Sequence, residues 1–331
     1  MQAIVYRRQP DNHYGFETIE KKMPDPSGHD LLVEIKAISV NPVDYKVKNM
    51  IAEGKPMVET LGFDAAGVVK AAGEKVRLFK PGDFVYYAGD ITRDGSYAEY
   101  QLVDERIAGK HPQSLDFTQA AAMPLTSLTA WEILFDRLKL HEESRQNVLI
   151  TGAAGGVGSI LVQLLKHKTR CQIITTYGRA QSREWLNRLG SDRSINHKHD
   201  LAEQLQEQGI NGIDIIISLT HTDQYVSQFA EIIEPQGDLV FIDEPRHFDL
   251  LAFKKKSISV HMEFMFTRSM YQTPDMIRQH EILNELADLI DKGVICSTMN
   301  ESLGKINVAN IVKAHDLLES SESRGKIILH Q

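Results

Sequence analysis

The chain has little cysteine, with only Cys171 and Cys296 among its 331 residues. Two cysteines cannot build a disulfide framework or a cysteine-rich structural metal site. No apolar run approaches the roughly 18 residues that a membrane-spanning helix needs. The first residues, MQAIVYRR, lack the basic-then-apolar order of a signal peptide. We therefore expect a cytoplasmic protein that has no membrane partner.

An excess of positive charge is also missing. The chain carries 37 Lys and Arg against 45 Asp and Glu, a net charge of −8, so a general affinity for nucleic acid is not expected. The one basic cluster, Lys254–Lys256, is typical of a solvated loop. The hydrophobic content of 42% and the charged content of 25% are those of a globular protein, and the length predicts about two domains.

The first 110 residues hold short apolar runs separated by turn residues, which is typical of a small closed or half-closed β unit. The run Leu31–Val40 ends at Asn41-Pro42, a pair that favours a turn. Another run, Phe84–Tyr87, follows the turn signal Pro81-Gly82-Asp83. Further strands are expected at 67–70 and 97–103.

The pattern changes near residue 115. Helical spacing covers Phe117–Leu134 with an interruption at Pro124, and strands and helices then alternate. Such alternation predicts a parallel sheet covered by helices. The expected strands are 147–151, 171–176, 213–219 and 239–242, and the expected helices are 159–166 and 182–189. A last helix is expected at 307–318 and a last strand at 326–329.

A glycine-rich loop, VLITGAAGGVG, covers Val148–Gly158. An apolar strand runs into Gly152, and a helix follows the later glycines. Glycines at these places allow the backbone to approach a pyrophosphate, which the N–H groups of the helix N-terminus then bind. Because the loop follows a strand and opens a helix, it predicts a dinucleotide site; a tight turn without ligand is the alternative.

The end of the next strand bears on the choice of dinucleotide. Loops specific for NAD usually carry an acidic residue about 20 positions further on, which binds the ribose 2′-hydroxyl. Here the strand ends with Thr175-Thr176-Tyr177-Gly178-Arg179, without a carboxylate. The planar fork of Arg179 suits a 2′-phosphate. The sequence therefore predicts NADPH, and a solvated arginine at a helix start is the alternative.

A set of motifs runs through nearly the whole chain in a fixed order. Besides the glycine loop, the motifs are Asn41-Pro42-Val43-Asp44, Gly62-Phe63-Asp64-Ala65-Ala66-Gly67, Pro81-Gly82-Asp83, Gly95-Ser96-Tyr97-Ala98-Glu99-Tyr100, Ala120–Trp131 and Gly325-Lys326. With these motifs the chain resembles the medium-chain dehydrogenase/reductase family, and most of all its zinc-free, quinone oxidoreductase-like branch, often labelled zinc-type alcohol dehydrogenase-like.

The resemblance implies an α/β fold in which a doubly wound Rossmann sheet is joined to a GroES-like β-barrel domain, with the cofactor in the cleft between them. Residues 1–120 would form the first part of the GroES-like catalytic domain. Residues 121–263 would form the Rossmann domain, and 264–331 would return to the catalytic domain. Similar proteins pair through an edge strand of the cofactor domain, which implies a homodimer.

The zinc chemistry of some relatives is not expected here. The resemblance places their zinc-binding Cys, His and Cys at Asn41, Phe63 and Leu125, and none of these side chains can supply the expected thiolate or imidazole. Asp64 alone does not make a site, and no cysteine precedes position 171. We expect no catalytic or structural metal.

The resemblance also implies site residues. Asn41 and Asp44 belong to the motif that faces the nicotinamide ribose, although both are also common in turns. Tyr45 follows directly, so Asp44 and Tyr45 are the predicted catalytic residues, with a partly buried aromatic as the alternative for Tyr45. The segment Glu263–Tyr271 either lines the substrate pocket or belongs to the core or a dimer edge. The predicted cofactor-binding residues are Asn41, Thr129, Gly152, Ala154, Gly155, Gly156, Val157, Thr176, Arg179, His197, Leu219, Phe241, Ile242 and Lys326.

Without zinc, hydride adds most easily to an activated double bond, and the resulting anion then needs a proton. The sequence therefore predicts an NADPH-dependent reductase of a small-molecule quinone or α,β-unsaturated carbonyl compound. Two alternatives stay open: a reductase of enoyl-thioester or aldehyde substrates, and an NADPH-binding regulatory or structural protein with vestigial activity.

Overall fold

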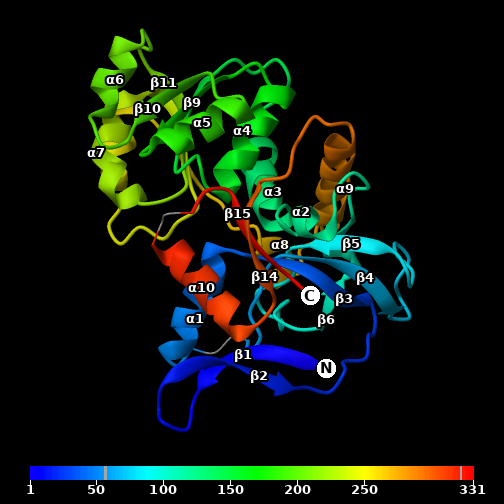
Figure 1. Ribbon diagram of the computed structural model, residues 1–331. Coiled ribbons are helices and arrows are strands. Elements are labelled where there is room, and N and C mark those ends of the chain that lie inside the picture. The colour runs from blue at the N-terminus through cyan, green and yellow to red at the C-terminus, as the bar shows by residue number, and fades with distance from the viewer. Residues whose placement is uncertain (56–57, 321–322) are drawn as a thin grey trace. The chain divides into compact units, whose positions relative to one another are not determined.

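The computed structural model describes residues 1–55, 58–320 and 323–331. The chain divides into two compact units, each with its own core. The first combines Met1–Leu128 with Met265–Gln331, and the second is Thr129–Phe264. In Figure 1 the second unit is green to yellow, and the first carries the remaining colours. Among the described residues, no helix has the length and apolarity required to cross a membrane.

The first unit is built on a seven-stranded sheet in the order β14-β15-β3-β4-β5-β7, with β6 paired to β3. The last strand of the chain, β15, pairs antiparallel with β3, so the C-terminal segment completes a sheet that the N-terminal segment begins. The strands are β3 (Asp30–Val40), β4 (Ala65–Ala72), β5 (Phe84–Tyr87), β6 (Tyr100–Asp104), β7 (Ala108–Lys110), β14 (Met299–Lys305) and β15 (Lys326–His330).

A hairpin and several helices surround this sheet. The hairpin pairs β1 (Gln2–Arg8) with β2 (Tyr14–Glu20). The red helix α10 (Val308–Glu319) lies beside the blue helix α1 (Pro42–Ala52), so segments from opposite ends of the chain pack together (Figure 1). The other helices are the 3-10 turn Glu105–Ile107, α2 (Phe117–Ala121), α8 (Thr267–Met270) and α9 (Arg278–Asp291). Helix α3 (Pro124–Trp131) continues as a π-helical stretch, Glu132–Arg137, into the second unit.

The turn expected at Asn41-Pro42 is wrong, because α1 begins there. Asn41 has an extended backbone and caps the helix, Pro42 occupies the first helical position, and the Asp44 carboxylate accepts the backbone N–H of Asn41. Proline suits this position because its missing N–H would have no partner inside the helix. The helix was hard to predict, since among its apolar residues only Val47 and Ile51 are buried.

The second unit contains a parallel sheet with the strand order β10-β9-β8-β11-β12-β13. The strands are β8 (Asn147–Thr151), β9 (Gln172–Tyr177), β10 (Arg193–Asn196), β11 (Ile213–Ser218), β12 (Ile233–Phe241) and β13 (Ser259–Met262). The helices are α4 (Gly156–Lys168), α5 (Ala180–Leu189), α6 (Leu201–Glu207), α7 (Thr222–Ile232) and the 3-10 stretch Leu250–Lys256. This is the doubly wound parallel sheet that the sequence predicts.

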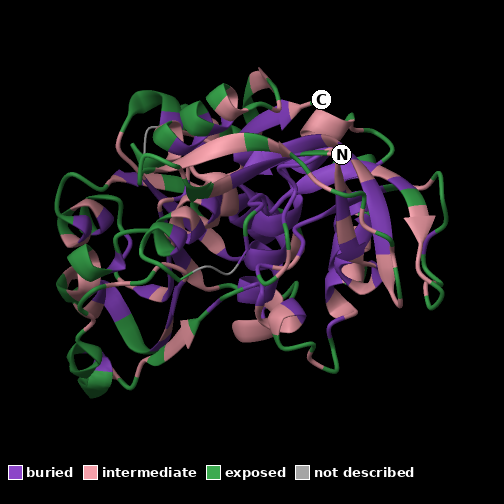
Figure 2. Ribbon diagram, turned by 90° about the horizontal axis from the view of Figure 1, so that it is seen from below, coloured by how far each residue is buried: buried purple, intermediate pink, exposed green. Residues whose placement is uncertain are grey.

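The strand order reverses between β8 and β11, and ligands bind at such reversals, beyond the carboxyl ends of the strands. The interior of the unit is apolar and includes Leu149, Ile216 and Leu239 from three neighbouring strands. Figure 2 shows buried residues along the strands and exposed ones along the loops. The strand β12 begins earlier than the expected 239–242; its early part was not predicted because Glu234, Pro235 and Gln236 are exposed and give no apolar signal.

Candidate cofactor and active site

The glycine loop joins β8 to α4 at the reversal of strand order. Gly152 has φ +67°, a left-handed conformation that side chains rarely adopt, and a Cβ there would lie 3.0 Å from Cγ2 of Thr220. A Cβ on Gly158 would lie 2.3 Å from the carbonyl oxygen of Ala153. The loop therefore needs glycine both to turn and to pack the helix against the strand.

The first turn of α4 has no acidic residue, and the cap residue Gly155 makes no side-chain cap. The first N–H groups of this 13-residue helix therefore have no acidic or capping side chain that would compete with an anion. The predicted loop residues Ala154, Gly155, Gly156 and Val157 are all half-buried. A pyrophosphate fits this arrangement, because Gly155 and Gly156 leave the backbone without side chains at a helix N-terminus.

Other predicted cofactor residues follow neighbouring strands of the same sheet. Thr176 is buried near the end of β9, and Arg179 is exposed as the cap residue of α5. Leu219 follows β11 and lies against Gly152. Phe241 ends β12, and Ile242 follows it with its N–H bonded to the carbonyl of Ser218. The structure thus brings these residues to one edge of the sheet.

His197 lies directly after β10, at the same edge. Its backbone N–H donates to the carbonyl of Tyr177, and a Cβ on Gly178 would lie 2.6 Å from its Nε2. The imidazole therefore covers Gly178, next to Arg179. Desolvation, together with the charges of Lys198 and His221, holds the pKa of His197 below its ordinary value.

The first unit contains a buried polar cluster formed by Asn41, Asp44, Asp64 and Lys326, each with at most 3% of its surface exposed. The Lys326 ammonium contacts Asp64 Oδ2 at 3.0 Å, the carbonyl of Val40 at 3.4 Å and Asn41 Oδ1. Asn41 in turn donates to Asp64 Oδ2 at 2.8 Å. The ammonium is thus held by oxygens, and the Asn41 carboxamide is oriented by the ion pair.

Asp64 is the centre of this cluster. Its Oδ1 accepts the backbone N–H of Leu125 at 2.8 Å, and its Oδ2 also accepts the Ser39 hydroxyl at 3.1 Å. Burial raises the pKa of Asp64 and lowers that of Lys326, while their mutual attraction and the hydrogen bonds into the carboxylate act in the opposite direction. Each charge is therefore stable only in the presence of the other.

Asp44 has a different environment. Its two oxygens accept backbone N–H groups, from Asn41 at 2.7 Å and from Gly62 at 3.0 Å. Burial raises the pKa of Asp44 to about 7, with a further rise from the charge of Asp64, although the two hydrogen bonds and Lys326 oppose the shift. These contacts make Asp44 a clamp between the start of α1 and the Gly62 turn. Tyr45, the next residue on α1, is half-buried.

The positions at which the resemblance places the zinc ligands of some relatives lie close together in this cluster. Asn41 binds both the carbonyl of Phe63 and the carboxylate of Asp64, and the Leu125 N–H binds Asp64 as well. The Phe63 ring packs edge-on against Phe266, with ring centroids 5.4 Å apart. Across the described parts of the chain, no group of three or more His, Cys, Asp or Glu residues could hold a metal ion. These residues do not fit zinc.

Thr129 is buried on α3 in the second unit. The segment Glu263–Tyr271 includes the buried Met265 and Phe266, whereas Phe264 and Tyr271 are exposed.

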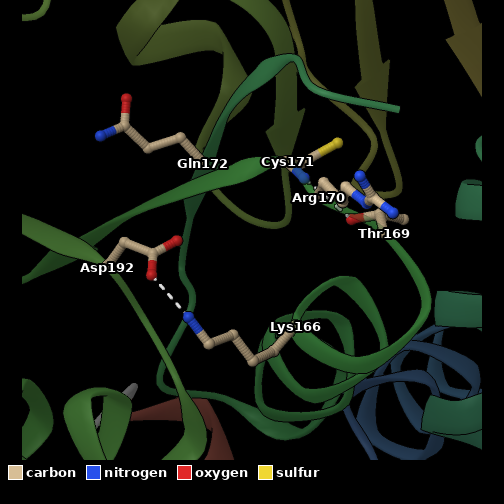
Figure 3. A pocket seen from close by; sticks show the side chains of 6 residues that line it. All are labelled: Lys166, Thr169, Arg170, Cys171, Gln172 and Asp192. Carbon is tan, nitrogen blue, oxygen red and sulfur yellow. Dashed lines mark hydrogen bonds and ion pairs between the residues drawn. The ribbon is translucent and has the colours of Figure 1, made fainter. Parts of the chain in front are cut away.

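A hollow of about 340 Å³ lies at the opposite edge of the parallel sheet, at the amino end of β9. Its lining includes Cys171 and Arg170, and Figure 3 shows Lys166 paired with Asp192 across it, at 2.7 Å. Because ligands of such sheets bind at the carboxyl ends of the strands, this hollow is not a candidate cofactor site.

Two polar features of the candidate site were not predicted from the sequence. One is Asp64 as the partner of Lys326, two residues 262 positions apart. The other is a hydroxyl chain at the carboxyl ends of β8, β11 and β12. It runs from Thr151 to Ser218 at 3.2 Å and on to Thr222 at 2.8 Å, and the Asp243 carboxylate accepts the N–H of Thr222 at 2.9 Å. The only sequence signal was the placement of these polar residues at or after strand ends.

Comparisons with known proteins agree with this architecture. Residues 27–113 match the family model of the alcohol dehydrogenase GroES-like domain, and residues 189–329 match that of the zinc-binding dehydrogenases. A zinc-type alcohol dehydrogenase-like protein of Staphylococcus aureus (strain MSSA476) is 41% identical over 322 residues, which cover 95% of each chain. A 2-methylene-furan-3-one reductase of Solanum lycopersicum is 27% identical over 93% of this chain and 73% of its own.

Two solved structures are also similar. A candidate zinc-dependent alcohol dehydrogenase from Rhizobium etli CFN 42 is 44% identical, with a TM-score of 0.93 over 100% of this chain and 98% of that one. The Escherichia coli quinone oxidoreductase, solved in complex with NADPH, is 25% identical, with a TM-score of 0.84 over 100% of both chains. The predicted combination of a GroES-like unit and a Rossmann sheet is thereby confirmed.

Proposed function

Because the chain belongs to the medium-chain dehydrogenase/reductase family, we propose that it is an NADPH-dependent, zinc-independent oxidoreductase that reduces small quinones or α,β-unsaturated carbonyl compounds. The choice of NADPH rests on the residues at the end of β9 and just after it. The exposed Arg179 lies two residues after it, and no carboxylate stands among Thr176, Tyr177 and Gly178 to bind a free 2′-hydroxyl. The E. coli relative solved with NADPH supports the same choice.

When bound, the nicotinamide supplies the hydride, and the protein binds and orients the reactants. The N–H groups of the α4 N-terminus and the glycine loop would hold the pyrophosphate, and Arg179 would pair with the 2′-phosphate. Apolar side chains lie at the same edge of the sheet, from Leu219, Phe241 and Ile242. His197, which lies against Gly178, would contact the adenosine end, and Thr129 would contact the nicotinamide end.

In the first unit, the cluster around Asp64 gives Lys326 and Asn41 fixed positions. Asp44 acts by positioning, because its two oxygens are occupied by backbone N–H groups of Asn41 and Gly62. Tyr45, on the same helix, is the proton donor to the anion that forms after hydride transfer. A fixed internal cation takes the place of an exchangeable metal. Location in the cytoplasm and assembly as a homodimer belong to the same proposal.

The choice of substrate rests on chemistry. Reduction of a quinone or an enone yields a delocalised anion, which a single proton donor can quench. Oxidation of a saturated alcohol would need a strong stabiliser of an alkoxide, the role that zinc has in metalloenzymes. The Solanum relative, named for the reduction of an enone, supports this substrate class.

The test is turnover of NADPH with a panel of soluble quinones, cyclic enones, an enoyl thioester, an aldehyde and a primary alcohol. We expect NADPH oxidation with quinones or enones, unchanged after dialysis against a chelator. Tight NADPH binding without turnover of any compound would favour a regulatory role, and turnover of the thioester or the aldehyde alone would replace the substrate class. A Tyr45→Phe variant should lose turnover and keep NADPH affinity.

A further inference from the structure

The hydroxyl chain of the second unit, formed by Thr151, Ser218 and Thr222, ends on the carboxylate of Asp243. Each of the three hydroxyl residues has at most 1% of its surface exposed. Oγ of Ser218 lies 3.2 Å from Oγ1 of Thr151 and 2.8 Å from Oγ1 of Thr222. The carboxylate of Asp243 accepts both the N–H and the hydroxyl of Thr222. The proposed reaction uses none of these groups directly, so their role depends on what they hold in place.

The direction of the hydrogen bonds follows from the number of protons. An ionised carboxylate only accepts hydrogen bonds, and each hydroxyl has a single proton to donate. Thr222 donates its proton to Asp243, so the proton between Ser218 and Thr222 comes from Ser218. The proton between Thr151 and Ser218 therefore comes from Thr151. Asp243 thus orders the whole hydroxyl chain in one direction.

The hydroxyl chain connects the ends of three neighbouring strands across the reversal of strand order. Thr151 ends β8, Ser218 ends β11, and the two residues are paired in the sheet. Asp243 lies two residues after the end of β12. The N–H of Ile242 donates to the carbonyl of Ser218 at 3.3 Å. The side chains therefore extend the connection between these strands to the edge at which ligands of such sheets bind.

Two of these strand ends lead directly into predicted cofactor residues, because Gly152 follows Thr151 and Leu219 follows Ser218. The segment after β11 lies against the glycine loop. A Cβ on Gly152 would lie 3.3 Å from Cβ of Leu219 and 3.0 Å from Cγ2 of Thr220. The hydroxyl chain holds this segment on both sides, so a displacement of the chain would change the surroundings of the glycine loop.

Asp243 also distinguishes the two helix N-termini at the reversal. Its carboxylate binds the N–H of Thr222, the first residue of α7. At the start of α4, by contrast, Gly155 makes no side-chain cap among the described residues. A carboxylate that already binds a helix N-terminus disfavours a phosphate there. The pyrophosphate is therefore directed to α4 and away from α7.

We propose that Asp243 is a positioning residue of the cofactor site, which acts through the hydroxyl chain to hold the segment after β11 against the glycine loop. This inference rests on the proposed nicotinamide dinucleotide site, but not on the choice between NADPH and NADH. The two cofactors share the pyrophosphate and differ at the 2′-phosphate. Loss of the hydroxyl chain should therefore weaken both by the same factor, whereas loss of Arg179 should distinguish between them.

Three variants interrupt the hydroxyl chain at different points. Asp243→Asn replaces one accepting oxygen with a donating NH₂ group, so only one of the two hydrogen bonds to Thr222 can remain. Thr222→Val removes the hydroxyl and keeps the backbone N–H. Ser218→Ala breaks the middle of the chain and leaves the contact between Thr222 and Asp243 in place.

Two further variants serve as controls. Thr222→Ser keeps the hydroxyl and should restore what Thr222→Val loses. Thr169→Val removes a hydroxyl that bonds two backbone groups at 2.7 and 3.2 Å, at the amino end of the same sheet. It should lower the stability of the unit without changing the affinity for either cofactor.

The test is fluorescence titration of the full-length protein and each variant with NADPH and with NADH, together with urea denaturation. Loss of a hydrogen bond to a charged group corresponds to about 10- to 150-fold in an equilibrium constant. We expect Asp243→Asn and Thr222→Val to weaken both cofactors equally, by about 10-fold. Ser218→Ala should weaken both by a smaller, equal factor, and Thr222→Ser should bind both as the wild type does.

Wild-type affinity in the folded variants that interrupt the chain, or a loss confined to NADPH, would overturn the role of Asp243. It would also be overturned if Thr222→Ser binds as weakly as Thr222→Val, or if Thr169→Val weakens binding to the same extent. If Asp243→Asn and Thr222→Val do not fold, Ser218→Ala decides. A wild type that binds neither cofactor would refute the proposed function itself, so the two failures are distinguishable.

Discussion

The ammonium nitrogen of Lys326 lies 3.0 Å from Oδ2 of Asp64, and both side chains are buried. Strand pairing brings them together, because β15 pairs with β3, and β3 pairs with β4, which begins directly after Asp64. The family resemblance places the metal ligands of zinc-dependent relatives at positions around Asp64. In this chain, a covalently attached cation neutralises the buried carboxylate there.

The first prediction concerns this ion pair. Lys326→Met leaves Asp64 as a buried, uncompensated charge, which typically costs about 3–5 kcal/mol of stability. We expect a loss of this size in the free energy of unfolding, measured by urea denaturation. The double variant Asp64→Asn/Lys326→Met should be more stable than the single one, because it no longer buries an unpaired charge.

The matched control is Lys48→Met. Lys48 pairs with Glu319 at 2.6 Å, but the Glu319 side chain is 40% exposed, and surface pairs contribute only about 0–1 kcal/mol. If Lys326→Met costs no more than Lys48→Met, the buried pair does not stabilise the fold as argued.

The second prediction concerns metal. Purified protein should contain no stoichiometric zinc, because Asn41, Phe63 and Leu125 supply neither thiolate nor imidazole. Elemental analysis of protein produced in zinc-supplemented medium measures this directly. About one zinc per chain that survives dialysis would contradict it.

The third prediction concerns Arg179. Loss of a charge-assisted hydrogen bond costs about 1.5–3 kcal/mol, so Arg179→Ala should weaken NADPH binding by roughly 10- to 150-fold. NADH binding should change much less. The control is Arg170→Ala, an exposed arginine at the amino end of β9. Equal weakening of both cofactors, or equal affinity of the wild type for both, would refute the phosphate assignment.

The parts of the fold that could be predicted are those with a local signal. The strand β8, the glycines that follow it and Arg179 lie within about 30 consecutive residues, so one strand–loop–helix–strand unit contains the whole pattern. By contrast, the cluster of Asn41, Asp64 and Lys326 joins three distant segments. No periodicity in the sequence indicates that a lysine in the apolar strand β15 is paired.

The helix α1 and the conformation of the loop after β11 were also not predicted, because their local sequence is ambiguous or their contacts are distant. The helix α1 follows a strand directly and begins with Asn-Pro, which favours turns as well as helix starts. His221, in the loop after β11, has a left-handed backbone with φ +55°, next to Thr222, whose N–H and hydroxyl bind the carboxylate of Asp243, 21 positions further along the chain. Such contacts are set by sheet topology and are not visible in local sequence.

The fourth prediction concerns association. The strand β13 is the last in the order of the second unit's sheet, and edge strands can pair with a second copy of the chain. Met262 at its end is 74% exposed. We expect a homodimer by light scattering. Met262→Asp should weaken it, because pairing through this edge would bury the new charge, whereas Leu78→Asp in the first unit should not. A stable monomer at micromolar concentration would contradict the prediction.

The last prediction concerns pH and His315, a buried residue of α10. Its Nε2 shares a hydrogen bond of 3.1 Å with the Tyr97 hydroxyl, and among the described residues its Nδ1 has no partner. Burial, with a smaller effect of the Lys48 charge, lowers the pKa of His315 to about 3. In the unfolded chain a histidine titrates near about 6.5. Between these values the unfolded state therefore binds more protons than the folded one.

The contribution of neutral His315 to stability is thus fully present above about pH 6.5 and is lost as the pH falls toward 3, at up to about 1.4 kcal/mol per pH unit. The measurement is urea denaturation between pH 7.5 and pH 4.5. We expect His315→Gln to lower stability at pH 7.5, because the packing of His315 against Phe16 and Tyr97 is altered. Its stability should also fall less steeply with acid than that of the wild type. His13→Gln, at a histidine whose side chain is 84% exposed, should retain the wild-type slope. Identical slopes in all three proteins would mean that His315 is not the residue whose protonation destabilises the fold.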